Sequence, residues 1–222
     1  MNRGIDPRRL RIQSAGTRLG LVVDDASAER LLAYIDLLQR WNRTYNLTAV
    51  REPDEMLVQH LFDCLAVVGP LRHVGEAGRL LDVGSGGGLP GVVIASMCPG
   101  WQVTCVDTVG KKAAFIQQAA VELRLPNLRS EHARVEALAL PPFDVITSRA
   151  FASLRDFVEL TRPGLKSGGV WMAMKGKRPD EEIAQLATDI DVFHVEQLSV
   201  PDLDAERCIV WMRPRRSHNK AP

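Results

Sequence analysis

The sequence has few cysteines and no long apolar run. Its 222 residues include four scattered cysteines, with no Cys-x-x-Cys pair: Cys64, Cys98, Cys105 and Cys208. This spacing argues against a disulfide framework or a zinc site, so we expect small core residues in a reducing compartment. The five histidines are scattered too, and no metal site is expected. No apolar run approaches the roughly 20 residues that span a bilayer, and the first residues lack the apolar stretch of a signal peptide. We therefore expect a cytoplasmic protein without membrane contact.

The formal net charge is only +1, but it is unevenly distributed. Residues 1–20 hold five arginines and one acid, and residues 211–222 hold four basic residues and no acid. The two ends thus carry +8 together, which leaves −7 for the residues between them. Basic ends of this kind are either arms that contact a polyanion or solvated tails, and charge alone leaves both interpretations open.

A glycine-rich turn between two apolar stretches is the most informative segment. Residues 80–83 enter it and residues 92–95 leave it, which predicts a strand, a tight loop and a helix. Glycines in such a loop let the backbone approach a ligand closely. The dinucleotide fingerprint Gly-x-Gly-x-x-Gly/Ala fails here, because Leu89 occupies its third position. A dehydrogenase is therefore disfavoured.

The spacing of the acid and the glycines resembles a different motif. Asp82 ends the predicted strand, and the glycines follow at every second position: Gly84, Gly86 and Gly88. This pattern resembles motif I of S-adenosylmethionine-dependent methyltransferases. A carboxylate at the strand end suits a sulfonium ligand with an amino group better than it suits a pyrophosphate.

A second acid supports a nucleoside ligand. Residues 101–107 have the pattern of a buried parallel strand that ends on Asp107, about twenty residues after the glycine loop. A carboxylate there can accept both ribose hydroxyls. The alternative is that Asp107 only caps the helix expected at residues 111–123. Because both acids end strands of one βαβ unit, we favour the ligand.

The remaining pattern predicts an α/β fold. Strands are expected at residues 80–83, 102–107, 127–130, 143–147, 170–174, 193–198 and 208–212, with helices at 89–97, 111–123, 153–161 and 180–187. The last two strands should pair antiparallel, because residues 200–206 are too few for a crossover. Two helices precede the sheet, one with Ser27 as N-cap and one over residues 54–68 that stops at Gly69-Pro70. We expect a basic arm and helical cap at 1–70, a core at 71–213 and a basic tail at 214–222.

Three cationic side chains are expected at the ligand-binding edge of the sheet. Arg149 and Lys175 follow predicted strands, and Arg207 opens the last strand. Together they could bind nucleic-acid phosphates or a cofactor carboxylate. The alternative is a surface role with salt bridges to Asp82, Asp107 and Asp144.

Longer segments resemble one family. They are Trp-Asn-x-x-Tyr-Asn-Leu-Thr at residues 41–48, His-Leu-Phe-Asp-Cys at 60–64, the glycine loop with Leu-Pro-Gly at 89–91, and Ser-Arg-Ala-Phe-Ala at 148–152. The chain resembles the RsmG (GidB) family, which methylates guanine N7 in bacterial small-subunit ribosomal RNA. The resemblance covers residues 28–212. The tryptophan-containing box is the most specific part, because generic methyltransferases lack it.

The resemblance implies a fold, a ligand and a set of site residues. It implies the Rossmann-like sheet of a class I methyltransferase with an N-terminal helical extension. The implied cofactor is S-adenosyl-L-methionine, and the implied partner is small-subunit ribosomal RNA or the 30S particle; we expect a monomer. We expect Asp82 and Gly88 to contact the cofactor. The resemblance implies further cofactor contacts at Gly84, Gly86, Leu89, Asp107, Val135, Glu136 and Arg149. It implies positioning roles for Asn46, His60 and Arg149, and RNA contacts at Arg134, Lys175 and Arg207.

The implied chemistry needs no general base. Guanine N7 has an in-plane lone pair and no proton to lose, so we assign no side chain as acid, base or nucleophile. His60 is equally well explained as a half-buried structural histidine. The sequence departs from the family pattern at Gly87, where many relatives have proline, and at Cys64, where serine is common. A ribosome-binding factor with a relic pocket stays open as an alternative, although the intact glycine loop argues against it.

Overall fold

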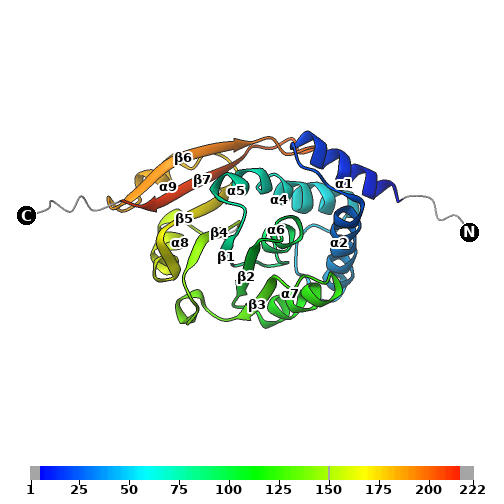
Figure 1. Cartoon of the computed structure of the whole chain (residues 1–222), viewed down its shortest axis with the longest axis horizontal. Helices are drawn as coiled ribbons and strands as arrows, with labels where there is room; N and C mark the ends of the chain where they lie inside the picture. Colours follow the sequence, from blue (N-terminus) through cyan, green and yellow to red (C-terminus); the bar gives the residue numbers. More distant parts are fainter. Residues whose placement is uncertain (1–5, 150, 216–222) are drawn as a thin grey trace, which may run out of the picture.

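A single seven-stranded sheet organises the molecule. The computed structural model describes residues 6–149 and 151–215. The strands are β1 (Gly78–Val83), β2 (Trp101–Asp107), β3 (Leu128–His132), β4 (Phe143–Ser148), β5 (Leu165–Lys175), β6 (Ile190–Leu198) and β7 (Arg207–Pro214). Their order is β3-β2-β1-β4-β5-β7-β6 (Figure 1). The first five strands run parallel, and β7 is antiparallel to both β5 and β6. The predicted α/β fold and its terminal hairpin are confirmed.

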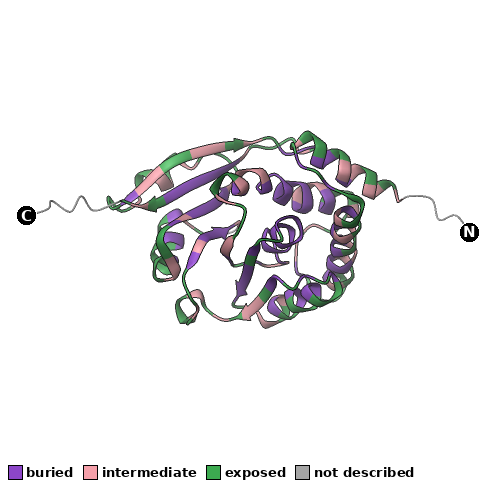
Figure 2. Cartoon of the chain, viewed as in Figure 1, coloured by how far each residue is buried: buried purple, intermediate pink, exposed green. Residues whose placement is uncertain are grey.

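Helices cover both faces of the sheet. They are α1 (Pro7–Arg18), α2 (Asp25–Tyr45), α3 (Pro53–Met56), a π-helical segment (Leu57–Phe62), α4 (Asp63–Leu65), α5 (Val68–Val74), α6 (Gly91–Met97), α7 (Gly110–Glu122), α8 (Leu154–Thr161) and α9 (Asp180–Ala184). Alternate strand residues divide between two cores: Leu80 belongs to the core that includes residues of α1–α7, and Leu81 belongs to the core that includes residues of α8 and α9. Figure 2 shows the buried residues concentrated in the strands and on the inner faces of the helices.

The basic N-terminal segment forms a packed helix. Asp6 caps α1 by accepting the Arg8 backbone N–H at 2.9 Å, and Ile12 and Ala15 are buried. Its arginines form ion pairs within the molecule: Arg8 with Asp6 and Asp36, Arg9 with Asp25 and Glu29, Arg11 with Asp54 and Asp202, and Arg18 with Asp202. These residues are therefore not a solvated tail, and contact of this end with a polyanion stays a prediction. Arg3 and residues 216–222 lie outside the described residues.

The helices before the sheet differ from the prediction in two places. Asp24 is the N-cap of α2, and its side chain accepts the backbone N–H of Ser27, which lies inside the helix. Gly69 and Pro70 do not end a helix, because they lie in the first turn of α5. Proline is tolerated there, since a first-turn N–H has no partner within the helix. The predicted single helix is therefore a series of shorter segments that includes the π-helical segment.

Candidate active site

Two cavities of about 420 Å³ each open near the carboxyl ends of the parallel strands. We call the first the glycine-loop cleft; its lining includes Gly84 and Asp107. We call the second the arginine pocket; its lining includes Arg149 and Arg207. The segment after β4 contributes to both, because Arg149 lines the arginine pocket and Phe151 lines the glycine-loop cleft.

The shape of the glycine loop depends on residues without a side chain. Gly84, Gly86 and Gly88 have φ values of +67°, +58° and +83°, in the left-handed region that favours glycine. Helix α2 holds this loop from the other side, because the Tyr34 hydroxyl donates a 2.6 Å hydrogen bond to the Gly87 carbonyl. A Cβ on Gly87 would lie 3.1 Å from Leu38 Cδ1, so α2 also limits the space beside the loop.

Asp107 ties the glycine loop to the start of α7. Its Oδ2 accepts the Gly86 N–H and its Oδ1 accepts the Val109 N–H, both at 2.9 Å. Lys112 lies 3.8 Å from Oδ2 and lines the same cleft. The interpretation of Asp107 as a helix cap is therefore wrong: Asp107 bonds Val109 just before α7, makes no capping hydrogen bond to the helix, and lines the cleft with its carboxylate.

Asp82 is fully buried at the end of β1, and its two carboxylate oxygens differ. Oδ2 accepts the Gly91 N–H at 2.9 Å, whereas Oδ1 has no hydrogen-bond partner among the described residues. Burial raises the pKa of Asp82 to about 6, although the Gly91 hydrogen bond opposes the shift. Asp82 does not line the cleft, but its neighbours Val83 and Gly84 do. Its unsatisfied negative charge therefore favours a cationic ligand in the cleft.

We expect the pH dependence of stability to report the titration of Asp82. Its folded-state pKa is about 6 against an ordinary value of 3.8, so folding favours the protonated form. This contribution to stability is fully present below pH 3.8 and is lost as the pH rises through 6. Relative to Asp82→Asn, the wild-type free energy of unfolding should fall by on the order of 3 kcal/mol between about pH 4 and pH 7. Urea unfolding of both proteins measures the difference, and a pH-independent difference would contradict the raised pKa.

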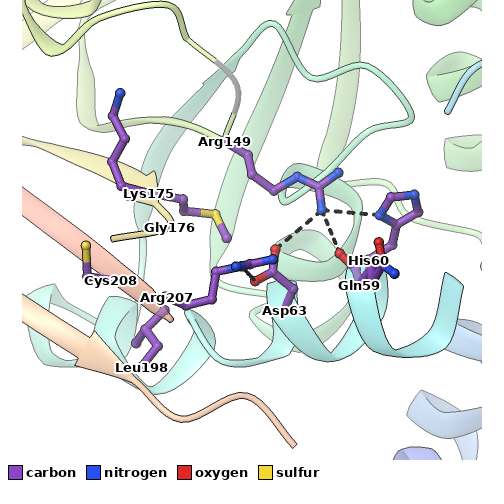
Figure 3. Close-up of a pocket in the computed structure, with 10 residues that line it drawn as sticks. Gln59, His60, Asp63, Arg149, Lys175, Gly176, Leu198, Arg207 and Cys208 are labelled. Carbon is purple, nitrogen blue, oxygen red and sulfur yellow. Dashed lines mark hydrogen bonds and ion pairs between the residues drawn. The ribbon is translucent and has the colours of Figure 1, made fainter. Parts of the chain in front are cut away.

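Two arginines share one buried carboxylate in the arginine pocket (Figure 3). Asp63 is 3% exposed; its Oδ1 accepts Arg207 Nε at 2.9 Å, and its Oδ2 lies 3.4 Å from Arg149 Nη1. The same Nη1 donates to the Gln59 carbonyl at 3.2 Å and to His60 Nδ1 at 3.4 Å. Arg149 is thus held through one terminal nitrogen of its guanidinium group.

His60 connects this pocket to the tryptophan-containing box. Its Nε2 lies 2.7 Å from Thr48 Oγ1, and the Thr48 N–H donates to Asn42 Oδ1 at 2.9 Å. Burial, together with the charge of Arg149, lowers the pKa of His60 to about 4, so the ring is neutral at pH 7. Since Arg149 can only donate, His60 Nδ1 is the acceptor and Nε2–H points to Thr48. His60 is therefore a buried linking residue that also lines the pocket.

Lys175 lines the arginine pocket but points away from Arg149 and Asp63 in Figure 3. Its Nζ bonds both carboxylate oxygens of Glu182, at 3.0 and 2.8 Å. The salt bridges expected for the edge cations thus form with other acids. Arg149 pairs with Asp63 and Lys175 with Glu182, and Asp144 pairs with Lys166 instead.

Of the other predicted site residues, Asn46 and Leu89 line neither cavity. Arg134, Val135 and Glu136 line the glycine-loop cleft, so Arg134 is not grouped with Lys175 and Arg207. Asn46 ends α2 in a left-handed conformation, and its side chain accepts from Arg51 at 3.3 Å. Leu89 is buried beside the loop.

Sequence reasoning assigned no role to Asp63, Lys112 or Glu182. Only Asp63 had a signal, because it lies three residues after His60 in a quoted motif and so on the same helical face. The four cysteines are buried free thiols, as expected. Within residues 6–149 and 151–215 there is no cluster of three or more potential metal ligands. No helix in this described part is long and apolar enough to cross a membrane.

Comparisons with known proteins point to one family. A family model described as rRNA small subunit methyltransferase G (GidB) matches residues 27–210. Ribosomal RNA small subunit methyltransferase G of Leptothrix cholodnii is 62% identical over 213 residues, covering 95% of this chain and 98% of that protein. The protein of the same name from Paracidovorax citrulli is 59% identical over 218 residues, covering 92% and 89%.

A solved structure shows the same fold. A SAM-dependent methyltransferase from Aquifex aeolicus superposes with a TM-score of 0.55 at 18% identity, over 72% of this chain and 93% of that chain. The family match spans most of the chain, including the glycine-loop cleft and the arginine pocket. The chain therefore belongs to the rRNA small subunit methyltransferase G (GidB) family.

Proposed function

We propose that this protein transfers the methyl group of S-adenosyl-L-methionine to N7 of a guanine in small-subunit ribosomal RNA. Family membership supports the reaction class and the RNA. The observation that carries the proposal is that residues close together in the sequence after β4 line both cavities. Arg149 lines one of them, and Phe151 and Ala152 line the other. A cofactor and a base bound in these cavities would meet across these residues.

The glycine-loop cleft fits the proposed cofactor. Asp107 presents a carboxylate for ribose hydroxyls, and Val135 and Glu136 would flank the adenine. The unpartnered Oδ1 of Asp82 supplies the negative charge that suits a cationic ligand. The proposal retains Gly84, Gly86, Gly88, Leu89 and Arg149 as cofactor contacts and Arg134 as an RNA contact.

The chemistry asks for positioning rather than proton transfer. When bound, S-adenosyl-L-methionine supplies an electrophilic methyl group: the N7 lone pair bonds to its carbon, the C–S electron pair stays on sulfur, and the positive charge passes to the purine. N7 loses no proton, so the neutral His60 is not needed as a base; it holds Arg149. Fixed orientation of two reactants contributes up to roughly 7–11 kcal/mol in favourable cases.

The cations of the arginine pocket are proposed to bind RNA. Arg207 and Lys175 would contact phosphates, and Asn46 and His60 would fix the surrounding segments. Such phosphate contacts orient the RNA without reading its sequence. We also propose that the protein acts in the cytoplasm, on free ribosomal RNA or on the 30S particle.

A transfer assay tests this proposal. The purified protein is incubated with radiolabelled S-adenosyl-L-methionine and with small or large ribosomal subunits from a strain that lacks the enzyme. We expect label only in the RNA of the small subunit. Label in ribosomal protein or in the large subunit would contradict the proposed substrate. Cofactor binding by calorimetry without any transfer would favour a non-catalytic ribosome-binding factor.

A further inference from the structure

Asp63 is the common partner of the two arginines that face the arginine pocket. Its side chain is 4% exposed, whereas each arginine side chain is 27% exposed. Arg149 comes from the end of β4 and Arg207 from the start of β7, so one carboxylate from α4 connects two separate strands. A buried aspartate with both oxygens engaged by guanidinium groups fixes their separation and orientation.

The remaining donors of both arginines are left for a ligand. Arg149 uses only Nη1 for Asp63, Gln59 and His60, while Arg207 uses Nε for Asp63 and Nη1 for the Glu206 carbonyl. Among the described residues, Nη2 of each arginine has no hydrogen-bond partner. Asp63 therefore immobilises both groups without using all of their donors.

The charge balance of the pocket also depends on Asp63. The lining includes three cations, Arg149, Lys175 and Arg207, and Lys175 is neutralised by Glu182. Asp63 offsets one of the two arginine charges. This matters for the proposed reaction, in which a neutral guanine becomes a cationic purinium, because uncompensated arginines would oppose the developing charge.

We propose that Asp63 is a positioning residue. It holds Arg149 and Arg207 at a fixed separation in the arginine pocket, where the guanine is proposed to bind, and it offsets their charge as the base becomes cationic. This inference rests on the proposed function. It assigns Asp63 no contact with the reacting atoms and no proton transfer. It predicts an effect on the rate of methyl transfer that is separate from RNA affinity.

The test is the variant Asp63→Asn, which keeps the size of the side chain and removes its charge. In single-turnover assays with small subunits, we expect methyl transfer to slow by about ten- to a hundredfold, the cost of a misplaced reactant. The dissociation constant for small-subunit RNA, measured by filter binding, should stay the same or decrease, because the pocket gains a positive charge. The affinity for S-adenosyl-L-methionine, measured by calorimetry, should fall much less than the rate, because Arg149 is one of several proposed cofactor contacts and keeps its bonds to Gln59 and His60.

Two further variants complete the design. Asp202→Asn is a matched control, because Asp202 also pairs with two arginines, Arg11 and Arg18, and is outside the arginine pocket. We expect it to keep the wild-type rate. Asp63→Glu restores the charge with one extra methylene, and its rate should lie between wild type and Asp63→Asn.

The inference is overturned if Asp63→Asn transfers at the wild-type rate, or if RNA affinity and rate fall in the same proportion. If Asp63→Asn does not fold, a wild-type rate in Asp63→Glu overturns it equally. Failure of the proposed function has a different signature, since the wild-type protein itself would then transfer no label to small-subunit RNA.

Discussion

Replacing Asp107 with alanine is expected to weaken S-adenosyl-L-methionine binding by about 100- to 1,000-fold. The carboxylate accepts the Gly86 and Val109 N–H groups, so its loss frees the glycine loop from the start of α7. It also removes the proposed acceptor for the ribose hydroxyls. Hydrogen bonds to charged groups contribute about 1.5–3 kcal/mol each. A combined loss of about 3–4 kcal/mol corresponds to this range of affinity.

Calorimetry on the purified variant measures the effect, and two controls make it specific. Asp144→Ala removes another strand aspartate, which bonds the Arg79 N–H and Lys166 and lines neither cavity. We expect its cofactor affinity to stay within about twofold of wild type. RNA affinity of Asp107→Ala should also be unchanged, since Asp107 is not in the arginine pocket. A dissociation constant within about fivefold of wild type would remove Asp107 from the cofactor site.

Gly91→Ala is expected to lower the free energy of unfolding by about 2–6 kcal/mol. A Cβ at this buried position would overlap Cys105 Sγ and lie 2.9 Å from Asp82 Oδ2. Overpacking of a core costs typically 1–3 kcal/mol. The shift of α6 would also break the hydrogen bond from the Gly91 N–H to Asp82, which costs a further 1–3 kcal/mol. For a chain of this size the melting temperature should fall by about 10 °C.

Thermal and urea unfolding measure this loss against a second glycine variant. The nearest atoms to a Cβ on Gly164 lie at 3.9 Å, so Gly164→Ala should change stability by less than about 1 kcal/mol. Equal stabilities of the two variants would show that the contact between α6, Asp82 and Cys105 is less rigid than the structure indicates.

The sheet was predictable because buried parallel strands form apolar runs. The expected strand positions agree with the structure to within three residues, except that β5 begins at Leu165 rather than at the expected residue 170. Helix α1 was not predictable, because its stability depends on distant partners. Only Ile12, Ala15 and Gly16 are buried in it, and its arginines pair with acids as far along the chain as Asp36, Asp54 and Asp202. No local pattern matches an arginine to such an acid.

The candidate site was likewise predictable only in part. Strand ends predicted that Arg149, Lys175 and Arg207 lie at one edge of the sheet, and all three line the arginine pocket. The salt-bridge partners named in the alternative interpretation were wrong, because Asp63 and Glu182 come from helices whose placement is a tertiary property. Arg134 lies in the other cavity because it follows β3, at the far edge of the sheet from β6 and β7.

The identity of the methylated atom tests the central claim most directly. Small-subunit RNA labelled by the wild-type protein is digested to nucleosides, and the labelled product is identified by mass spectrometry against methylated standards. The proposed reaction, which needs no general base, predicts 7-methylguanosine at a single position in the RNA. Label on a ribose hydroxyl, on an exocyclic amine or on a base carbon would contradict it, because transfer to each of those atoms releases a proton and the proposed reaction releases none.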